Sequence, residues 1–198
     1  MSRGARRRAE LLSAVVAHLL EFGMAGFSLR VAASAAGTSH SMLLYHFGSQ
    51  EALLREALHA IRERRLDDLR ALARRKPRDM SAMLRLLGRE TPELRVLRQS
   101  FGLAQIDPDR YGGIAVDAVH DDLAVTEELL ARLVGDRQLP PGTATLVAAA
   151  LRGLVFDGLV TGDRARVTLA VRVLESLVAA GGPDEAGSRS DAGGVAVI

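Results

Sequence analysis

The sequence predicts an all-α protein, and three observations support this class. Apolar residues recur at intervals of three and four along most of the chain, as they do on one face of a helix. Alternation with a period of two, which marks half-buried strands, is absent. Glycine, proline and N-capping residues divide the chain into segments of helical length, about nine in all. We expect an N-terminal domain of three helices followed by a larger helical domain.

The first three helices are expected within the first fifty residues of the chain. Apolar side chains share one face over residues 5–22, and glycine follows them. Ser28 is placed to cap a short helix over residues 29–36. A second short helix is expected over residues 39–47, after a glycine that allows a sharp turn. Two short helices joined in this way have the layout of a helix-turn-helix.

Turn and breaker residues divide the rest of the chain into longer helices. These are expected over residues 49–75, 80–88, 92–106, 114–134, 143–161 and 165–180. Residues 107–113 are rich in turn formers and are expected to form a loop. Residues 181–198 are poor in apolar side chains and are expected to form a disordered tail. We therefore divide the chain into residues 1–50, which continue into the linking helix, and residues 51–180.

Composition excludes several classes of function. The chain has no Cys, which excludes disulfides, thiolate zinc sites and cysteine nucleophiles. It has no glycine-rich phosphate loop, no Gly-x-Ser-x-Gly and no His-Glu-x-x-His. We expect a protein that is not an enzyme and that holds no cofactor or metal. The basic N-terminus lacks a cleavage site, and no apolar run reaches the roughly 20 uninterrupted residues that span a bilayer. We expect a soluble, cytoplasmic protein without a membrane partner.

Positive charge is concentrated near the N-terminus. Residues 1–50 hold five Arg and two Glu, whereas the rest of the chain holds 21 basic and 22 acidic residues. A basic module on a near-neutral body suits an encounter between that module and phosphate, although a solvated charged surface explains the same pattern. In the predicted helix-turn-helix, the second helix begins with Ser39, His40 and Ser41, which can reach phosphates or base edges in a major groove.

The same stretch carries a more specific pattern. It consists of Phe27-Ser28-Leu29-Arg30, Ala33, Ala36-Gly37-Thr38-Ser39, Leu43, Tyr45-His46-Phe47 and Ser49-Gln50-Glu51-Ala52-Leu53-Leu54. Residues 5–60 thereby resemble the DNA-binding domain of the tetracycline-repressor (TetR) family. The resemblance implies a dimeric transcriptional regulator, normally a repressor, that binds a palindromic operator in double-stranded DNA. It also implies release from DNA by a small-molecule effector. An architectural or orphan helix-turn-helix protein that binds DNA without a ligand is the alternative.

The resemblance implies which residues contact DNA. They are Arg6, Ser28, Arg30, Thr38, Ser39, His40, Ser41, Met42, Tyr45, His46 and Gln50. His40 and Ser41 would read bases, whereas Tyr45 and His46 would bind phosphates. Most family members have Tyr in place of Leu44 and Lys in place of Gln50, so this chain would either make fewer ionic contacts or replace them with Arg30 and the N-terminal arginines. Met42 either touches a thymine methyl group or is buried, and Phe47 is expected in the core.

The last two predicted helices are apolar on more than one face, which favours a partner subunit. The expected interface of a homodimer consists of Leu146, Ala150, Gly153, Val167, Val171, Leu174 and Val178. The alternative is that these helices form the central core of a monomer.

The resemblance places the effector in the second domain. Candidate lining residues are Met83, Leu87, Phe101, Gln105, His120 and Phe156, and each of them could equally be an ordinary residue of the core. His120 lies near Asp117, Asp121 and Asp122, a composition that suits a metal, but a solvated acidic face is the preferred interpretation. The helix over residues 49–75 is the expected lever between motif and effector.

Overall fold

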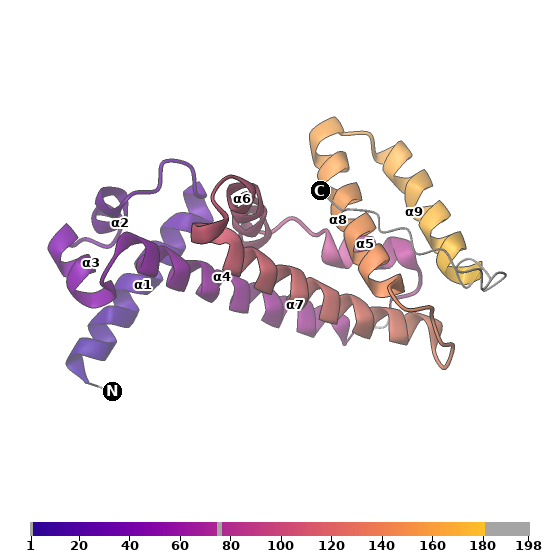
Figure 1. Ribbon diagram of the computed structural model, residues 1–198, viewed down its shortest axis with the longest axis horizontal. Coiled ribbons are helices and arrows are strands. Elements are labelled where there is room, and N and C mark those ends of the chain that lie inside the picture. The colour runs from indigo at the N-terminus through magenta and orange to yellow at the C-terminus, as the bar shows by residue number, and fades with distance from the viewer. Residues whose placement is uncertain (1, 75–76, 181–198) are drawn as a thin grey trace, which may run out of the picture.

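The computed structural model describes residues 2–74 and 77–180, with the backbone alone for residues 72 and 73. The expected tail over residues 181–198 lies outside the described residues. The described part consists of nine α-helices without a strand, as the sequence predicts (Figure 1). They are α1 (Arg3–Phe22), α2 (Leu29–Ala35), α3 (His40–Phe47), α4 (Gln50–Ala73), α5 (Met80–Leu87), α6 (Pro92–Ile106), α7 (Pro108–Val134), α8 (Thr143–Thr161) and α9 (Arg164–Ala180).

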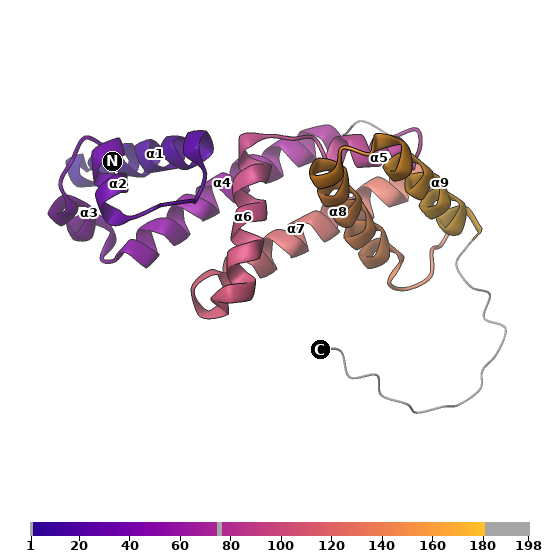
Figure 2. The ribbon, with the colours of Figure 1, turned by 90° about the horizontal axis from the view of Figure 1, so that it is seen from above.

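The molecule is elongated, with α1–α3 at one end and α8 and α9 at the other (Figure 1). The two longest helices, α4 and α7, pack along each other and connect the two ends. Helix α6 crosses both of them near the middle, and Figure 2 shows it between the N-terminal helices and α8. We call α1–α3 with the first turns of α4, residues 3–58, the N-terminal unit, and α5–α9 with the rest of α4 the C-terminal unit.

Each unit has its own cluster of buried apolar side chains. In the N-terminal unit, Leu11, Val15 and Leu19 of α1 pack with α3 and α4, so the predicted face of the first helix is the buried one. Val96 and Leu97 of α6 belong to the same cluster. The second cluster joins α4, α5 and α7 to α8 and α9. Helix α6 is therefore packed directly against the N-terminal core as well as against the C-terminal unit.

The expected loop over residues 107–113 is wrong, because α7 begins at Pro108. The side chain of Asp107 accepts a hydrogen bond from the backbone N–H of Arg110, at 3.2 Å. An N-cap Asp followed by Pro at the first helical position starts a helix well, since Pro has no N–H to leave unsatisfied. The turn-forming residues therefore mark the start of a helix rather than a loop.

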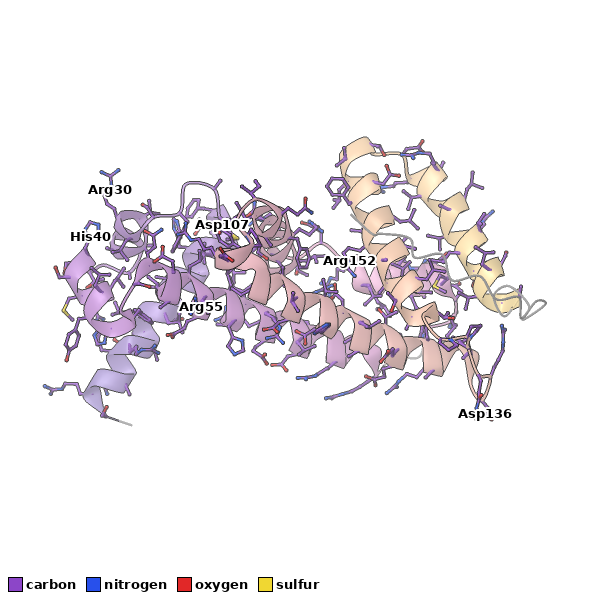
Figure 3. The ribbon with its side chains drawn as sticks, viewed as in Figure 1. Arg30, His40, Arg55, Asp107, Asp136 and Arg152 are labelled. Carbon is purple, nitrogen blue, oxygen red and sulfur yellow. The ribbon has the colours of Figure 1, made fainter. Side chains whose placement is uncertain are left out.

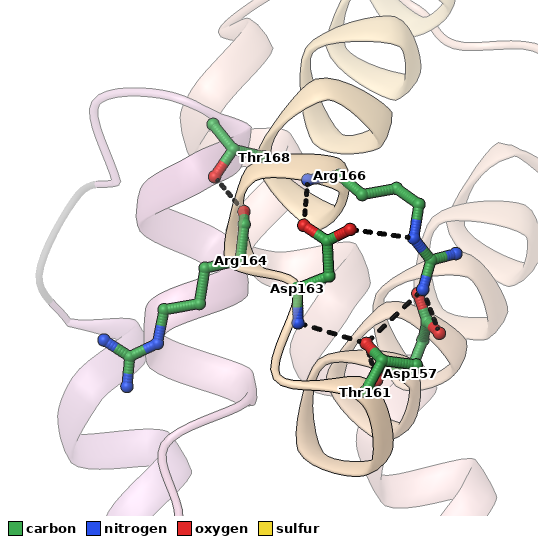
Figure 4. Close-up of polar contacts among 6 residues, drawn as sticks. All are labelled: Asp157, Thr161, Asp163, Arg164, Arg166 and Thr168. Atoms are coloured by element: carbon green, nitrogen blue, oxygen red, sulfur yellow. Dashed lines mark hydrogen bonds and ion pairs between the residues drawn. The ribbon is translucent and has the colours of Figure 1, made fainter.

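A short, well-bonded turn joins α8 to α9 (Figure 4). Gly162 takes a left-handed backbone conformation with φ of 70°, which ends α8. Asp163 caps α9 by accepting from the backbone N–H of Arg166 at 3.0 Å, and the Arg166 side chain donates to Asp157 at 2.7 Å. These contacts fix α8 and α9 as one antiparallel pair.

Candidate nucleic-acid interface and effector cavity

The turn between α2 and α3 has the geometry that the sequence predicts. Gly37 takes a positive φ of 58°. Its N–H donates to the Ser34 carbonyl at 3.1 Å, and the Thr38 N–H donates to the Ala33 carbonyl at 2.9 Å. Ser28 and Ser39 cap α2 and α3, each accepting a backbone N–H at 3.3 Å. The two short helices are therefore held in a fixed mutual orientation.

Helix α3 has a buried face and an exposed face. Leu43 is completely buried, and Phe47 is buried as predicted. Ser39, His40, Ser41, Met42 and Tyr45 are exposed, Tyr45 to 80% of its surface. Figure 3 shows Arg30 and His40 pointing away from the molecule at this end. The exposed face of α3 is thus available to a partner, and the exposure of Met42 removes the alternative that it is buried.

The other candidate DNA contacts lie around the same end of the molecule. Ser28, Thr38 and His46 are half-buried, whereas Arg6 and Arg30 are exposed. The Arg6 guanidinium lies 3.9 Å from the Glu10 carboxylate on the same helix. Exposed pairs of this kind are weak, so Arg6 can exchange partners.

Two side chains hold the motif together through contacts that the sequence did not predict. The Gln50 side-chain oxygen accepts from the Leu29 N–H at 3.0 Å, so Gln50 fastens the start of α2 to α4. Arg8 donates to the His46 carbonyl at 3.0 Å, and its guanidinium lies 4.6 Å from the centre of the Phe47 ring. Arg8 also pairs with Glu56. Arg8 therefore anchors α1 to α3, a structural use that no local pattern reveals.

The C-terminal unit contains two adjoining cavities between α4, α6, α7 and α8. They have about 40 and about 20 Å³ of free space, and Leu94, Phe101 and Asp122 line both of them. Arg98 and Arg152 line the larger cavity, whereas Arg65 lines the smaller one. Arg98, Phe101 and Arg152 also line an open groove of about 720 Å³ between α6 and α8.

Four of the predicted pocket residues line these spaces. Leu87 and Phe101 line the larger cavity, and Phe101, Gln105 and Phe156 line the groove. Met83 is instead completely buried in the C-terminal apolar cluster, because α5 packs that face against its neighbours. His120 is exposed on α7 and lines none of the cavities found among the described residues. The predictions for Met83 and His120 are therefore wrong.

The charged residues of the cavities escaped sequence reasoning. Burial raises the pKa of Asp122, while the nearby charges of Arg152 and Arg65 act to lower it. Burial lowers the pKa of Arg65, which Asp122 partly offsets. The neighbouring Asp121 is paired with Arg62, whose Nη2 lies 3.1 Å from the carboxylate. Within residues 2–74 and 77–180, no group of three or more His, Asp or Glu side chains is arranged to hold a metal.

Solved structures with the same architecture are found for proteins of low sequence identity. A Streptomyces coelicolor protein described as a transcriptional regulator has a TM-score of 0.67 and 20% identity, over 87% of this chain and 98% of that one. A Mesorhizobium loti protein assigned to the TetR family has a TM-score of 0.60 and 20% identity, over 91% and 96%. The multidrug-binding protein EbrR in complex with ethidium has a TM-score of 0.64 and 23% identity, over 87% and 98%.

The chain has the TetR-family fold. No family model matches its sequence, and no curated protein is similar to it in sequence. The likeness is therefore one of architecture, and it extends over most of the length of each protein compared.

In this TetR fold, α8 and α9 both expose apolar side chains, but on α9 they are not the residues that the sequence predicts. Val167, Val171, Leu174 and Val178 are buried in the core of the protomer itself. The prediction that these four residues form the dimer interface is wrong, because a side chain that the protomer already buries cannot also line its surface. The exposed apolar residues are Leu146, Phe156, Leu159 and Val160 of α8 and Leu169, Val173 and Leu177 of α9. Of the three residues predicted on α8, Leu146 and Gly153 are exposed and Ala150 is half-buried.

Helix α6 of the TetR fold is bonded to the end of α1. Arg95 donates to the carbonyls of Leu20 and Glu21, the latter at 3.1 Å. Gln99 accepts from the Met24 N–H at 2.8 Å. Because Arg95 and Gln99 also line the groove, α6 contacts both the groove and the N-terminal unit. The sequence predicts α4 as the lever between motif and effector, and these contacts make α6 a second connection.

Proposed function

We propose that this protein is a DNA-binding transcriptional regulator that acts as a homodimer and responds to a small-molecule effector. The observation that carries the proposal is the exposed face of α3, which begins with Ser39, His40 and Ser41 and is presented by a glycine turn. A second helix of this kind inserts its N-terminal residues into the major groove, while the first helix braces against the backbone. The TetR fold supports the same interpretation.

The proposed contacts divide by their chemistry. His40 and Ser41 face outward at the start of α3 and would read base edges. Arg30 and Arg6 would bind phosphates by charge, and Tyr45 and His46 would bind phosphates by hydrogen bonds. Gln50 is better assigned to positioning α2, because its side-chain oxygen is already bonded to the Leu29 N–H.

The proposed dimer uses the exposed apolar faces of α8 and α9. Helix α8 is long and apolar enough to cross a membrane by length and composition, and few of its residues are buried within the protomer. We favour a second copy of the chain over lipid as the partner that covers this face, since the charged residues Arg152 and Asp157 interrupt the apolar sequence of α8. Arg152 turns toward the cavity, and Asp157 pairs with Arg166. Two such helix pairs would form a four-helix interface with two-fold symmetry.

The proposed effector site consists of the two cavities between α4, α6, α7 and α8 and the adjoining groove between α6 and α8. Solved structures of EbrR contain proflavin or ethidium. In this chain, the larger cavity and the groove share Arg98, Phe101 and Arg152. A ligand that moves α6 would act on the end of α1 through Arg95 and Gln99, and so change the spacing of the two recognition helices. We assign the protein no catalytic reaction and no cofactor, and we place it in the cytoplasm with its DNA.

The test is selection of bound fragments from the source genome, followed by titration of a selected fragment at several salt concentrations. Arg30→Ala should weaken binding and reduce the slope of log K against log salt by about one per protomer. Arg64→Ala removes an equally exposed arginine from α4 and should leave the slope unchanged. His40→Ala should change the selected sequence. Absence of preference for any double-stranded fragment at low ionic strength would overturn the proposal.

A further inference from the structure

Three arginines from three different helices meet at the two cavities of the C-terminal unit. Arg65 comes from α4, Arg98 from α6 and Arg152 from α8. Figure 3 shows Arg152 on α8, and the shared lining places it with Arg98 and Phe101 of α6. Arginine is costly to bury unless its donors are satisfied, so a convergence of three demands acceptors at the same place.

The described part of the chain supplies only some of those acceptors. Arg65 is only 4% exposed, and its Nη2 donates to the Leu87 carbonyl at 2.6 Å. Its Nε and Nη1 are buried without a partner among the described residues, as are Nη1 of Arg98 and Nε of Arg152. Buried donors are nearly always bonded in native proteins, and an unsatisfied group calls for an explanation. Four such nitrogens around one pair of cavities indicate that a ligand rich in acceptors completes the site.

The balance of charge indicates the sign of that ligand. Arg62 and Asp121 of the lining neutralise each other, and Glu90 accepts from Arg98 at 2.6 Å. Asp122 is the other carboxylate of the lining, and it forms no ion pair in the described part of the chain. At the cavity walls, Arg65, Arg98 and Arg152 thus face Asp122, and Glu90 offsets one more charge from outside the lining, which leaves a surplus of one positive charge at the walls. Asp68 and Glu93 act on Arg65 from outside the lining. One negative charge on a ligand would balance the surplus at the walls.

The shape of the site indicates the rest of the ligand. The larger cavity, with about 40 Å³ of free space, has room for a small head group. Its walls include the apolar side chains of Leu87, Leu151 and Val155, which offer no hydrogen bond to a second polar group of the ligand. The adjoining groove of about 720 Å³ is wide enough for an organic body and includes Phe156. The site therefore suits a molecule with one charged end and a larger, mainly apolar remainder.

We propose that the effector is an organic monoanion whose carboxylate is held by Arg98 and Arg152, with Arg65 behind them, and whose apolar body occupies the groove between α6 and α8. This inference rests on the proposed function, because it specifies the chemical class of the effector. Guanidinium groups bind a carboxylate through charge-assisted hydrogen bonds, which are roughly twice as strong as neutral ones. Helix α6 carries Arg98, and it also carries Arg95 and Gln99, which contact the end of α1. A displacement of Arg98 by the ligand would therefore be transmitted to the N-terminal unit.

The test is calorimetric titration of the full-length protein, without DNA, with benzoate, phenylacetate and octanoate. Each acid is compared with its own neutral amide, and inorganic phosphate is titrated separately. We expect at least one of the carboxylates to bind at least about tenfold more tightly than its amide. Arg152→Gln should weaken binding of that carboxylate about tenfold or more. Arg64→Gln, at an exposed position of α4, is the matched control and should have no effect.

Asp122→Asn is a second variant, and it should change the affinity for the carboxylate in the opposite direction. It removes a negative charge from the lining while keeping the shape of the side chain, so the bound carboxylate should bind more tightly. Circular dichroism checks that each variant is folded. The proposal is overturned if amides bind as tightly as the acids, if no member of the panel binds, or if Arg152→Gln has no effect. Tighter binding of phosphate than of every organic acid would overturn it as well.

The proposed function is tested separately by DNA binding. Failure of every carboxylate to bind would overturn the assignment of the effector and leave a sequence-selective DNA complex intact. Binding that depends on Arg152 but leaves the occupancy of DNA unchanged at saturation would support the anion site and contradict its role as the effector site. The two failures are therefore distinguishable.

Discussion

The N-terminal and C-terminal units differ in the polar side chains that they bury and in the apolar surface that their last helices leave exposed. The N-terminal unit buries a purely apolar set among its described residues. Beyond it, α4, α6 and α7 bury Arg65, Ser100 and Thr126, while α8 and α9 leave large apolar residues such as Val173 and Leu177 exposed. Neither feature of the C-terminal unit stabilises a monomer, because burial of an incompletely bonded charge costs free energy and apolar surface that stays exposed contributes none.

The contrast indicates what each unit is built for. A recognition helix works when its position is fixed, and an apolar core that is well packed provides this. An effector site requires polar groups that are completed only by the ligand, and a dimer requires apolar surface that is completed only by the partner. On the proposed function, the C-terminal unit leaves two surfaces incomplete in the monomer, and binding of the effector and of a second copy would recover the free energy that they forgo.

The largest effect is expected from a charge placed on the exposed apolar face of α9. Val173→Glu should convert the dimer into monomers of 21.2 kDa, because a carboxylate at the centre of an apolar interface is left without a partner. Sedimentation velocity measures the change. Val116→Glu is the control, since Val116 is similarly exposed but lies on α7. A dimer that persists in Val173→Glu would place the interface elsewhere.

The next largest effect is expected in the N-terminal unit. Leu43→Ala leaves a cavity beneath α3 and should lower the free energy of unfolding by about 3 kcal/mol, since Leu43 is completely buried. Leu44→Ala, one residue further along the same helix, removes a partly exposed side chain and should change stability by no more than about 0.5 kcal/mol. Urea denaturation measures both. Equal losses would contradict the account of α3 as a helix pinned by one face.

The helices and the motif could be predicted from the sequence because their determinants are local. The caps at Ser28 and Ser39 and the positive φ of Gly37 each depend on a few neighbouring residues. The same local reasoning failed at Asp107-Pro108, where residues that form turns also start helices.

The cavity and the dimer face could not be predicted because their determinants are distant in sequence. Charged residues such as Arg65 and Asp122 are expected at the surface of a helix. Only the packing of α4 against α7 brings both of them to the smaller cavity. Helix α9 is apolar on two faces, so its periodicity could not show that Val171 packs within the protomer while Val173 remains exposed. The Gln50 contact to Leu29 spans 21 residues and has no signal in either segment alone.

A smaller effect, of opposite sign, is expected at Arg65. Arg65→Met should raise the free energy of unfolding of the ligand-free protein by about 1 kcal/mol, because it removes a buried charge with two unpartnered nitrogens. Burial lowers the pKa of Arg65, which has the same physical cause. Arg64→Met, at the exposed neighbouring position, should leave stability nearly unchanged. A loss of stability in Arg65→Met would show that its bond to the Leu87 carbonyl outweighs the burial of charge.

The smallest effect is expected at Asp122, and it depends on pH. Burial raises the pKa of Asp122 in the folded protein, against the opposing charges of Arg152 and Arg65. Above that pKa the carboxylate is charged in both states, and the folded state is the one that is destabilised. As the pH falls through the folded pKa, the folded protein takes up a proton first and gains stability relative to the unfolded chain.

Asp122→Asn lacks the charge at every pH, so its Tm should exceed that of the unmodified protein at neutral pH, and the difference should shrink as the pH falls. Asp121→Asn is the matched neighbour and should lower Tm at neutral pH, because it leaves Arg62 without its closest carboxylate. Thermal melts at a series of pH values measure both variants against the same background of other titrating groups. A lower Tm for Asp122→Asn at neutral pH would show that attraction to Arg65 and Arg152 outweighs burial. The C-terminal core would then hold compensated charges, and the contrast with the N-terminal unit would rest on the exposed apolar residues of α8 and α9.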